Sequence, residues 1–172
     1  LDAADGVMVA RGDLGVQLPL EQVPFVQKQI LDAANKKGKI SITATEMLQS
    51  MKSSYRPTRA EVTDITNAIL EGSDAVMLSA ETSIGDNPNR VVEVMSLICK
   101  ETDSKNDTSS LLSKENTSQD STATLARAAV QIANEIQAKA IVAFTETGRT
   151  PLLISNFRPQ AEIITFSNLL II

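Results

Sequence analysis

The sequence predicts an α/β protein in which a parallel sheet is followed by a second, smaller α/β region. Short apolar runs alternate with segments of helical periodicity over the first hundred residues. Three of these runs begin at Gly6, Ile40 and Ala75, so one strand and one helix recur every 34 or 35 residues. Because strands that are separated by helices pair in parallel and are buried, this pattern is typical of a parallel sheet.

The first unit is expected to contain a strand, a turn and a helix. The strand covers residues 6–10, and the turn covers residues 11–15, where two glycines flank Asp13. The helix covers residues 21–37, and Gly38 follows at the position of a C-cap glycine. The apolar face of this helix is formed by Val23, Val26, Ile30 and Ala34.

The second and third units repeat this order. The second has a strand over 40–44 and a helix over 58–71, which opens with the capping-box spacing Thr58-Arg59-Ala60-Glu61. The third has a strand over 75–79 and a helix from about 88 to 101. The inward face of that helix is formed by Val91, Val94, Met95 and Ile98.

The stretch from Thr102 to Gln119 is rich in Ser, Thr, Asn and Asp and is expected to be a linker or surface loop. The second region then has strands over 140–144 and 162–166, connected by a turn over 145–149 and a helix over 150–157. Another helix begins at residue 121. Its inward face is expected to consist of Leu125, Ala128, Ala129, Ile132 and Ile136.

Composition excludes several classes of function. The 172 residues include no His and a single cysteine, Cys99, which excludes a zinc site of the usual kind and a Ser-His or Cys-His triad. A net charge of −5 without a basic run argues against nucleic acid as a partner, and no apolar run is long enough to span a membrane. The lone cysteine fits a reducing compartment, so a cytoplasmic location is expected. Since the first residue is not Met, we expect a piece of a longer chain.

Polar side chains follow each of the first three predicted strands. The strand ends carry Arg11-Gly12-Asp13, Thr45-Glu46 and Ser79-Ala80-Glu81-Thr82. In parallel α/β folds, ligands bind at this end of the strands. Carboxylates, hydroxyls and glycine N–H groups suit a phosphate or carboxylate substrate with bound Mg²⁺. Taken singly, each residue also has a structural interpretation, as a turn residue, a cap of the next segment or a solvated charge.

Four ordered motifs resemble the pyruvate kinase family. The first, DGVMVARGDLGV at residues 5–16, is similar to the signature segment of the family. The others follow at the family's spacing: ATEMLQSM at 44–51, RPTRAE at 56–61, and MLSAET at 77–82 with GDNP at 85–88. The resemblance continues more weakly to residue 168.

The resemblance implies the fold in more detail. Residues 1–102 would be the last three βα units of a TIM (β/α)8 barrel, and residues 103–120 a linker or surface loop. Residues 121–172 would be the first part of the smaller α/β C-terminal, regulatory domain. The inner face of the barrel part is then expected to carry Val7, Val9, Ile42, Val76 and Leu78.

The resemblance also implies an activity, the transfer of a phosphoryl group from phosphoenolpyruvate to ADP, which yields pyruvate and ATP in glycolysis. The implied cofactors are Mg²⁺ and K⁺, and the implied assembly of the complete enzyme is a homotetramer. The family's catalytic lysine and second metal-binding carboxylate lie on an earlier strand of the barrel. Its lid domain and K⁺ ligands also lie outside the matched motifs, so this chain alone is expected to be inactive.

Residue roles are carried over from the matched motifs. Asp13 matches the family's metal-binding aspartate. The segment that holds the carboxylate and phosphate of the substrate is matched by Ala10, Arg11, Gly12 and Asp13. Thr45 matches the threonine beside the enolate, and is implied in catalysis and substrate binding. Ser79 and Glu81 match residues near the path of proton delivery.

A loop in the second region resembles the loop that grips a sugar phosphate in members regulated by fructose bisphosphate. It consists of Thr145, Glu146, Thr147, Gly148, Arg149 and Thr150. A phosphorylated sugar is therefore an implied effector. The chain departs from many members at Glu46, where they have Gln, and Glu146 adds negative charge to a phosphate-binding loop.

Two alternatives stay open on the sequence. The chain could be a non-catalytic remnant that serves as an interaction or assembly module. It could also belong to a barrel lyase that acts on pyruvate or phosphoenolpyruvate. A lyase would share the strand-end carboxylates but would not explain the segment PTRAE at residues 57–61.

Overall fold

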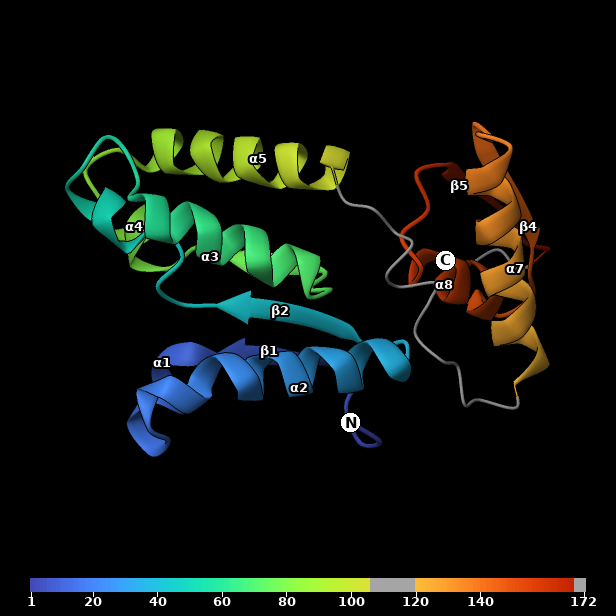
Figure 1. Ribbon diagram of the computed structural model, residues 1–172, viewed down its shortest axis with the longest axis horizontal. Helices are drawn as coiled ribbons and strands as arrows, with labels where there is room; N and C mark the ends of the chain where they lie inside the picture. The colour runs from blue at the N-terminus through green and yellow to red at the C-terminus, as the bar shows by residue number, and fades with distance from the viewer. Residues whose placement is uncertain (106–119, 169–172) are drawn as a thin grey trace. The chain divides into compact units, whose positions relative to one another are not determined.

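The protein divides into two compact units, Leu1–Asn106 and Asp107–Ile172. The computed structural model describes residues 1–105 and 120–168. Each unit is α/β, as the sequence predicts, and each has a parallel sheet of its own (Figure 1). Most of the predicted linker, residues 106–119, lies outside the described residues.

The sheet of the first unit has the strand order β1-β2-β3, with all strands parallel. The strands are β1 (Gly6–Ala10), β2 (Ile40–Ala44) and β3 (Ala75–Met77). The first two match the predicted bounds, whereas β3 ends before the predicted residues Leu78 and Ser79. This early end has a local cause, because the Ser79 N–H donates to the Glu81 carboxylate.

Helical segments follow each of these strands. They are α1 (Arg11–Gln17), η1 (Leu20–Gln22), α2 (Val23–Lys36), η2 (Gln49–Lys52), α3 (Arg59–Leu70), α4 (Ala80–Ser83) and α5 (Pro88–Lys105). The predicted capping box is present, since Thr58 Oγ1 accepts the Glu61 N–H at 3.2 Å and the Glu61 carboxylate accepts the Thr58 N–H at 2.7 Å. Helix α5 continues past the predicted end at residue 101, into the segment predicted as a linker.

Helices α3 and α5 pack side by side (Figure 1), and together with the segment around η2 they form the core of the first unit. It consists of Met47, Leu48, Met51, Ile65, Ala68, Ile69, Val91, Val94 and Met95. Ile98 packs against this cluster, so the predicted inward face of α5 is confirmed. Burying a side chain of this size contributes about 1.5–3 kcal/mol, and the cluster therefore fixes η2 against both helices.

The residues predicted for one inner face of the sheet belong to two faces. Val9 is fully buried, and Val76 and Leu78 pack against the core under the helices. Ile42 pairs in register with Met8, which is 51 % exposed, on the other face. The prediction of an inner face is therefore wrong for Val9, Val76 and Leu78, which lie on the side of the helices. Side chains alternate along each strand, but the sequence does not show which residues of neighbouring strands share a face.

The segment predicted as a turn, residues 11–15, is the start of helix α1. Glycines such as Gly12 and Gly15 disfavour a helix by about 1 kcal/mol each relative to alanine. The first turn is held nonetheless, because Arg11 and the Gly12 N–H bond to the loop after β2. These long-range contacts outweigh the local propensity.

The second unit has two parallel strands and two helices. They are α7 (Ser121–Glu135), β4 (Ala140–Phe144), α8 (Arg149–Ser155) and β5 (Glu162–Phe166). Both strands match their predicted bounds, and they pair in register from Ala140 with Glu162 to Phe144 with Phe166. Within residues 1–105 and 120–168, no helix combines the length and apolar character needed to cross a membrane.

Helix α7 buries a different face from the predicted one. The larger apolar residues expected inside, among them Leu125, Ile132 and Ile136, are exposed. The buried face consists of Ala123, Ala126, Val130 and Ala133. Small side chains let the helix approach β4 and α8 closely, where Val130 packs with Ala143 and Ile154. The prediction failed because α7 is apolar on both faces, so that periodicity alone could not choose between them.

Candidate functional site

The carboxyl ends of the three strands of the first sheet lie next to one another. Ala10 pairs with Ala44, and Ala44 pairs with Met77. The segments that follow these residues therefore leave the sheet at one edge. Hydrogen bonds join the three segments there: Arg11 and Gly12 bond to Thr45 in the loop after β2, and Glu81 bonds to the same loop at Leu48.

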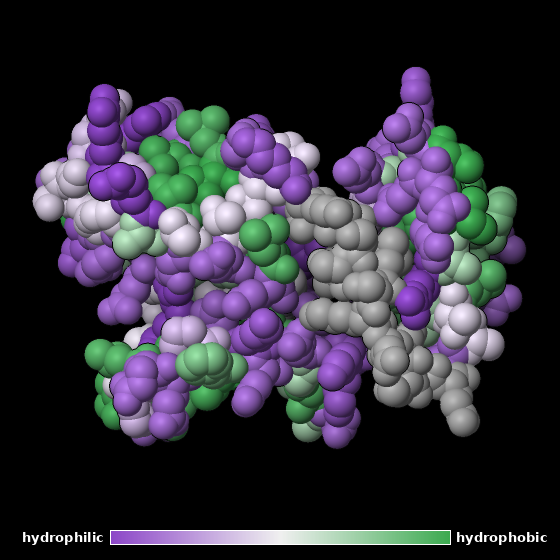
Figure 2. All heavy atoms as spheres, viewed as in Figure 1, coloured by the Kyte–Doolittle hydropathy of each residue, from purple (hydrophilic) through white to green (hydrophobic). Residues whose placement is uncertain are grey.

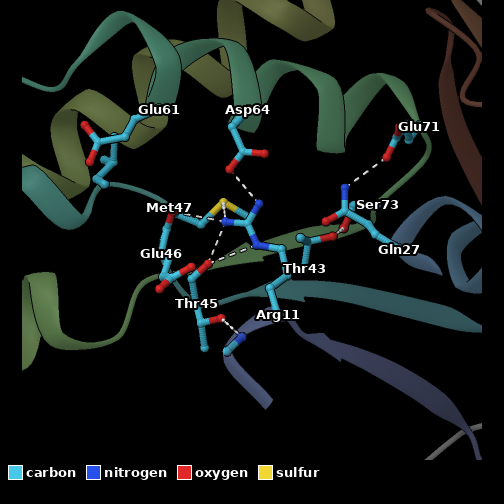
Figure 3. A network of polar contacts seen from close by, with 12 residues as sticks. Arg11, Gln27, Thr43, Thr45, Glu46, Met47, Glu61, Asp64, Glu71 and Ser73 are labelled. Carbon is cyan, nitrogen blue, oxygen red and sulfur yellow. Dashed lines mark hydrogen bonds and ion pairs between the residues drawn. The ribbon is translucent and has the colours of Figure 1, made fainter. Parts of the chain in front are cut away.

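The guanidinium of Arg11 ties the start of α1 to the loop after β2 (Figure 3). Nε and Nη2 donate to the Thr45 carbonyl oxygen at 3.1 and 2.6 Å, and Nη2 also donates to the Glu46 carbonyl oxygen at 3.1 Å. Nη1 pairs with the Asp64 carboxylate of α3 at 2.5 Å. Because each nitrogen has a partner and the side chain is only 9 % exposed, Arg11 supports the loop in this structure.

The loop after β2 begins with two residues in the left-handed backbone region. Thr45 has a φ of 71° and Glu46 a φ of 56°. A β-branched residue adopts this conformation rarely, and strained backbone of this kind clusters at functional sites. Thr45 Oγ1 accepts the Gly12 N–H at 2.9 Å. Since the hydroxyl oxygen is the acceptor in that bond, its own hydrogen can be donated to a ligand.

The segment after β3 joins the same edge through Glu81. One carboxylate oxygen accepts the Leu48 N–H at 3.1 Å, and the other accepts the Ser79 N–H at 2.8 Å. Ser79 is the N-cap residue of α4, and Glu81 lies in the first turn of that helix. The predicted residues Ser79 and Glu81 are thus placed beside the loop that carries Thr45.

Glu61 secures the far end of that loop. Its carboxylate accepts the backbone N–H and the hydroxyl of both Ser50 and Thr58, at 2.6 to 3.0 Å. Partial burial alone would raise the pKa of Glu61, but the hydrogen bonds from Ser50 and Thr58 outweigh it and lower the pKa below its ordinary value. The ionised form therefore stabilises the connection from η2 to α3.

Asp13 is the candidate metal ligand at this edge. It lies in the first turn of α1 and is exposed to solvent. Among the residues that the structure describes, no three His, Cys, Asp or Glu side chains gather in a way that could hold a metal ion. Mg²⁺ is often held by one or two carboxylates together with water and substrate phosphates. Asp13 therefore fits the role of one protein ligand to Mg²⁺.

The loop predicted to hold a sugar phosphate connects β4 to α8 in the second unit. Gly148 has a left-handed φ of 79°, and its N–H donates to Thr145 Oγ1 at 3.0 Å. The Arg149 guanidinium pairs with the Asp120 carboxylate at 2.5 Å. The positive charge of this loop is thus already matched by a carboxylate, and Glu146 is exposed beside it.

Two groups that shape the strand-end site have no signal in the sequence. Asp64 lies in the middle of α3, and it matters because Arg11, 53 positions earlier, reaches its carboxylate. The Leu48 N–H is a backbone group in an apolar stretch, and it matters because Glu81 accepts it. Neither contact could be found from local pattern, since both join residues that are distant along the chain.

Family models match both units. The model for the barrel domain of pyruvate kinase matches residues 1–92, and the model for its alpha/beta domain matches residues 123–169. The chain belongs to the pyruvate kinase family. The resemblance seen in the motifs is therefore confirmed, and the barrel-lyase alternative is wrong.

Individual pyruvate kinases agree with this result. The chain is 46 % identical to the pyruvate kinase of Eimeria tenella over 171 residues, and 48 % identical to pyruvate kinase 2 of Synechocystis sp. over 164 residues. It matches the crystal structure of a pyruvate kinase from Cryptosporidium parvum with a TM-score of 0.87 and 43 % identity. These matches cover 95 to 98 % of this chain but only 27 to 35 % of the relatives, so the chain spans about a third of their length.

Proposed function

We propose that this chain supplies part of the active site of a pyruvate kinase, which transfers a phosphoryl group from phosphoenolpyruvate to ADP in glycolysis. The observation that carries the proposal is the edge of the first sheet, where hydrogen bonds of Arg11, Gly12 and Glu81 join three strand ends in a chain of this family. In this proposal, residues 1–102 are the last three βα units of a TIM (β/α)8 barrel. Residues 103–120 connect the two domains, although residues 103–105 are the end of α5, and residues 121–172 begin the C-terminal domain.

The proposed roles of the first segment concern binding. Asp13 would hold Mg²⁺ at its exposed carboxylate, and the ion would offset negative charge on the phosphoryl group during transfer. The segment from Ala10 to Asp13 would line the site for the carboxylate and phosphate of the substrate, while the Arg11 side chain supports the loop after β2. The support for these roles is the match to the family's signature segment and the place of Asp13 directly after β1.

The proposed roles of the other two segments concern the proton. After phosphoryl transfer, the enolate must be protonated at carbon to give pyruvate. Thr45 would orient the enolate and pass on a proton, because its hydroxyl accepts from Gly12 and can still donate. A threonine hydroxyl is a weak acid, so water would be the source of the proton. Ser79, at the neighbouring strand end, would belong to the same relay.

The proposal for the complete enzyme includes K⁺ as a second cofactor, a homotetramer and a cytoplasmic location. It also includes a phosphorylated sugar as effector at residues 145–150. Arg149 would have to exchange its partner Asp120 for the phosphate of that effector. These parts of the proposal rest on membership of the family.

A chimeric enzyme tests the proposed activity. Residues 1–168 replace the matching segment of the pyruvate kinase of Geobacillus stearothermophilus, which is 43 % identical over 170 residues. With Mg²⁺ and K⁺ present, we expect the chimera to make pyruvate from phosphoenolpyruvate and ADP. A chimera that folds, binds both substrates and makes no pyruvate, beside an active parent enzyme, would contradict the proposal.

A further inference from the structure

Glu81 is buried although its side chain carries a charge. It is 1 % exposed, and within residues 1–105 and 120–168 it is the single charged residue classed with the buried core. A carboxylate that loses its hydration must be compensated by hydrogen bonds or by a counter-charge. The compensation here comes from the Leu48 and Ser79 N–H groups, one on each oxygen. Hydrogen bonds to an ionised acceptor are about twice as strong as neutral ones, so the carboxylate joins two backbone segments firmly.

The segment that Glu81 holds is the strained one. Strained backbone persists where the surrounding contacts over-determine it. Arg11 binds the carbonyl oxygens of Thr45 and Glu46 at the start of the loop. Glu81 binds the Leu48 N–H a few residues later. The two side chains therefore act on opposite ends of the segment that carries the Thr45 hydroxyl.

We propose that Glu81 is a positioning residue for the reaction proposed above, on which this inference rests. Its carboxylate fixes the loop after β2 relative to Ser79 and so keeps the Thr45 hydroxyl beside the Gly12 N–H. The family motif alone places Glu81 near the path of proton delivery. In the structure both oxygens contact backbone N–H groups, and Glu81 acts through Thr45.

Other contacts keep these segments together when the carboxylate is altered. The Asp86 N–H donates to the Lys52 carbonyl oxygen at 2.9 Å, which joins the chain after α4 to η2. A Cβ built on Gly85 would lie 2.2 Å from the Glu81 carbonyl oxygen, so the backbone packs closely there. Leu48 and Met51 are fully buried in the apolar core. A change in the Glu81 side chain should therefore displace the loop without unfolding the unit.

Two substitutions in the chimeric enzyme test the inference by kinetics. Glu81→Gln keeps the length but turns an NH₂ group towards one N–H donor, whereas Glu81→Asp keeps the charge but is too short to reach both donors. Because a displacement of about 1 Å can cost about 100-fold in rate, we expect both to lower kcat by roughly 10- to 100-fold. The KM for phosphoenolpyruvate and the shape of the pH–rate profile should change little. Glu93→Gln, on an exposed position of α5, is the matched control.

Amide hydrogen exchange provides a readout that does not depend on turnover. In the unmodified chimera, the amides of Leu48 and Ser79 should exchange slowly although both lie outside strands. In Glu81→Gln they should exchange at least about tenfold faster, while the amides of α2 keep their protection. An inactive chimera would contradict the proposed function, yet exchange would still show whether Glu81 holds the loops.

Three results would overturn the inference. The first is fast hydrogen exchange of the Leu48 amide in the unmodified chimera. This measurement does not depend on whether a Glu81 variant folds. The second is exchange that Glu81→Gln leaves unchanged. The third is a Glu81→Asp variant that keeps its activity with a displaced pH–rate profile, as expected of a group that transfers the proton itself.

Discussion

Some side chains at the strand-end site form hydrogen bonds within the protein, whereas others are available to a ligand. Glu81 is buried and Arg11 is largely covered, and their polar atoms bond to backbone groups and to Asp64. Asp13 is exposed, and Thr45 keeps a hydroxyl hydrogen that can be donated. Substitutions of the first pair should therefore act through the loop, and substitutions of the second pair should act on bound ligands directly.

Asp13→Asn in the chimeric enzyme should weaken Mg²⁺ binding, because an amide is a poorer ligand for a hard cation than a carboxylate. We expect the Mg²⁺ concentration for half-maximal activity to rise by at least about tenfold, an effect of roughly 1.4 kcal/mol. A Mg²⁺ titration of the rate measures this. Asp5→Asn is the control, since Asp5 is exposed before the same strand, at its other end. Normal activity at ordinary Mg²⁺ would remove Asp13 from the metal site.

Thr45→Val should slow protonation of the enolate more than phosphoryl transfer. Valine has the shape of threonine but lacks the hydroxyl, so the proton relay loses a member and a loss of about 10²-fold is expected. Proton exchange at the methyl group of pyruvate measures this step without ADP. Thr45→Ser, which keeps the hydroxyl, should restore most of the exchange. Unchanged exchange together with a collapse of phosphoryl transfer would mean that the assigned role is wrong.

Among the elements, the connection from β2 to α3 is held by side chains at three points. Arg11 holds its start, Glu81 holds its middle, and Glu61 holds its end through Ser50 and Thr58. The apolar core lies beneath it, with Met47, Leu48 and Met51 fully buried. This connection carries Thr45, so its rigidity bears directly on the candidate site.

Glu61→Gln should destabilise the start of α3 at neutral pH. The folded protein lowers the pKa of Glu61 below its ordinary value of 4.5, so the stabilisation is present above that pH and is lost as the pH falls further. We expect the free energy of local opening at pH 7 to fall by about 1 kcal/mol, a typical cost of a lost cap. Amide exchange of α3 at pH 7 and near pH 4 measures it. If the free energy of opening of Glu61→Gln differed from that of the parent by the same amount at both pH values, the stabilising role of the ionised Glu61 would be contradicted. The control Glu93→Gln should show no effect.

In the molecule as a whole, both units leave apolar surface exposed (Figure 2). In the first unit, Met8 and Ile40 are exposed on the sheet. In the second unit, the exposed residues of β4, β5 and α7 are Val142, Phe144, Ile164, Phe166, Leu125, Ile132 and Ile136. Large apolar patches of this kind are typical of surfaces that other protein covers. In a chain that spans about a third of the length of its relatives, the remaining parts of a pyruvate kinase are the expected cover.

The chain of 172 residues by itself should make no pyruvate, and it should self-associate through this apolar surface. Exposing several large side chains costs about 1.5–3 kcal/mol each, which offsets much of a typical domain stability of about 5–15 kcal/mol. Light scattering after size exclusion, together with an activity assay, tests this, and the chimeric enzyme is the control. Where this isolated chain is only partly folded, we expect residues 121–168 to be its more ordered half. A soluble monomer with measurable turnover would contradict the prediction.

Local pattern was sufficient for much of the fold. The strands β1, β2, β4 and β5 have their predicted bounds, because apolar runs of this length between turn residues are too short for a helix and are typical of buried strands. The cap of α3 was predictable because its partners, Thr58 and Glu61, are three positions apart. The four motifs were sufficient for the family, because they are specific in residue type, order and spacing.

Long-range packing decided the rest. The helical state of residues 11–17, the buried face of α7 and the faces of the first sheet each depend on a neighbour that is distant along the chain. The role of Glu81 is of the same kind, since a carboxylate after a strand can be solvated, can transfer protons or can hold backbone. Its burial against the Leu48 and Ser79 N–H groups selects the last of these. The physical reason is that residue type and spacing set what a side chain can do, whereas desolvation and partner geometry, which arise only on packing, set what it does.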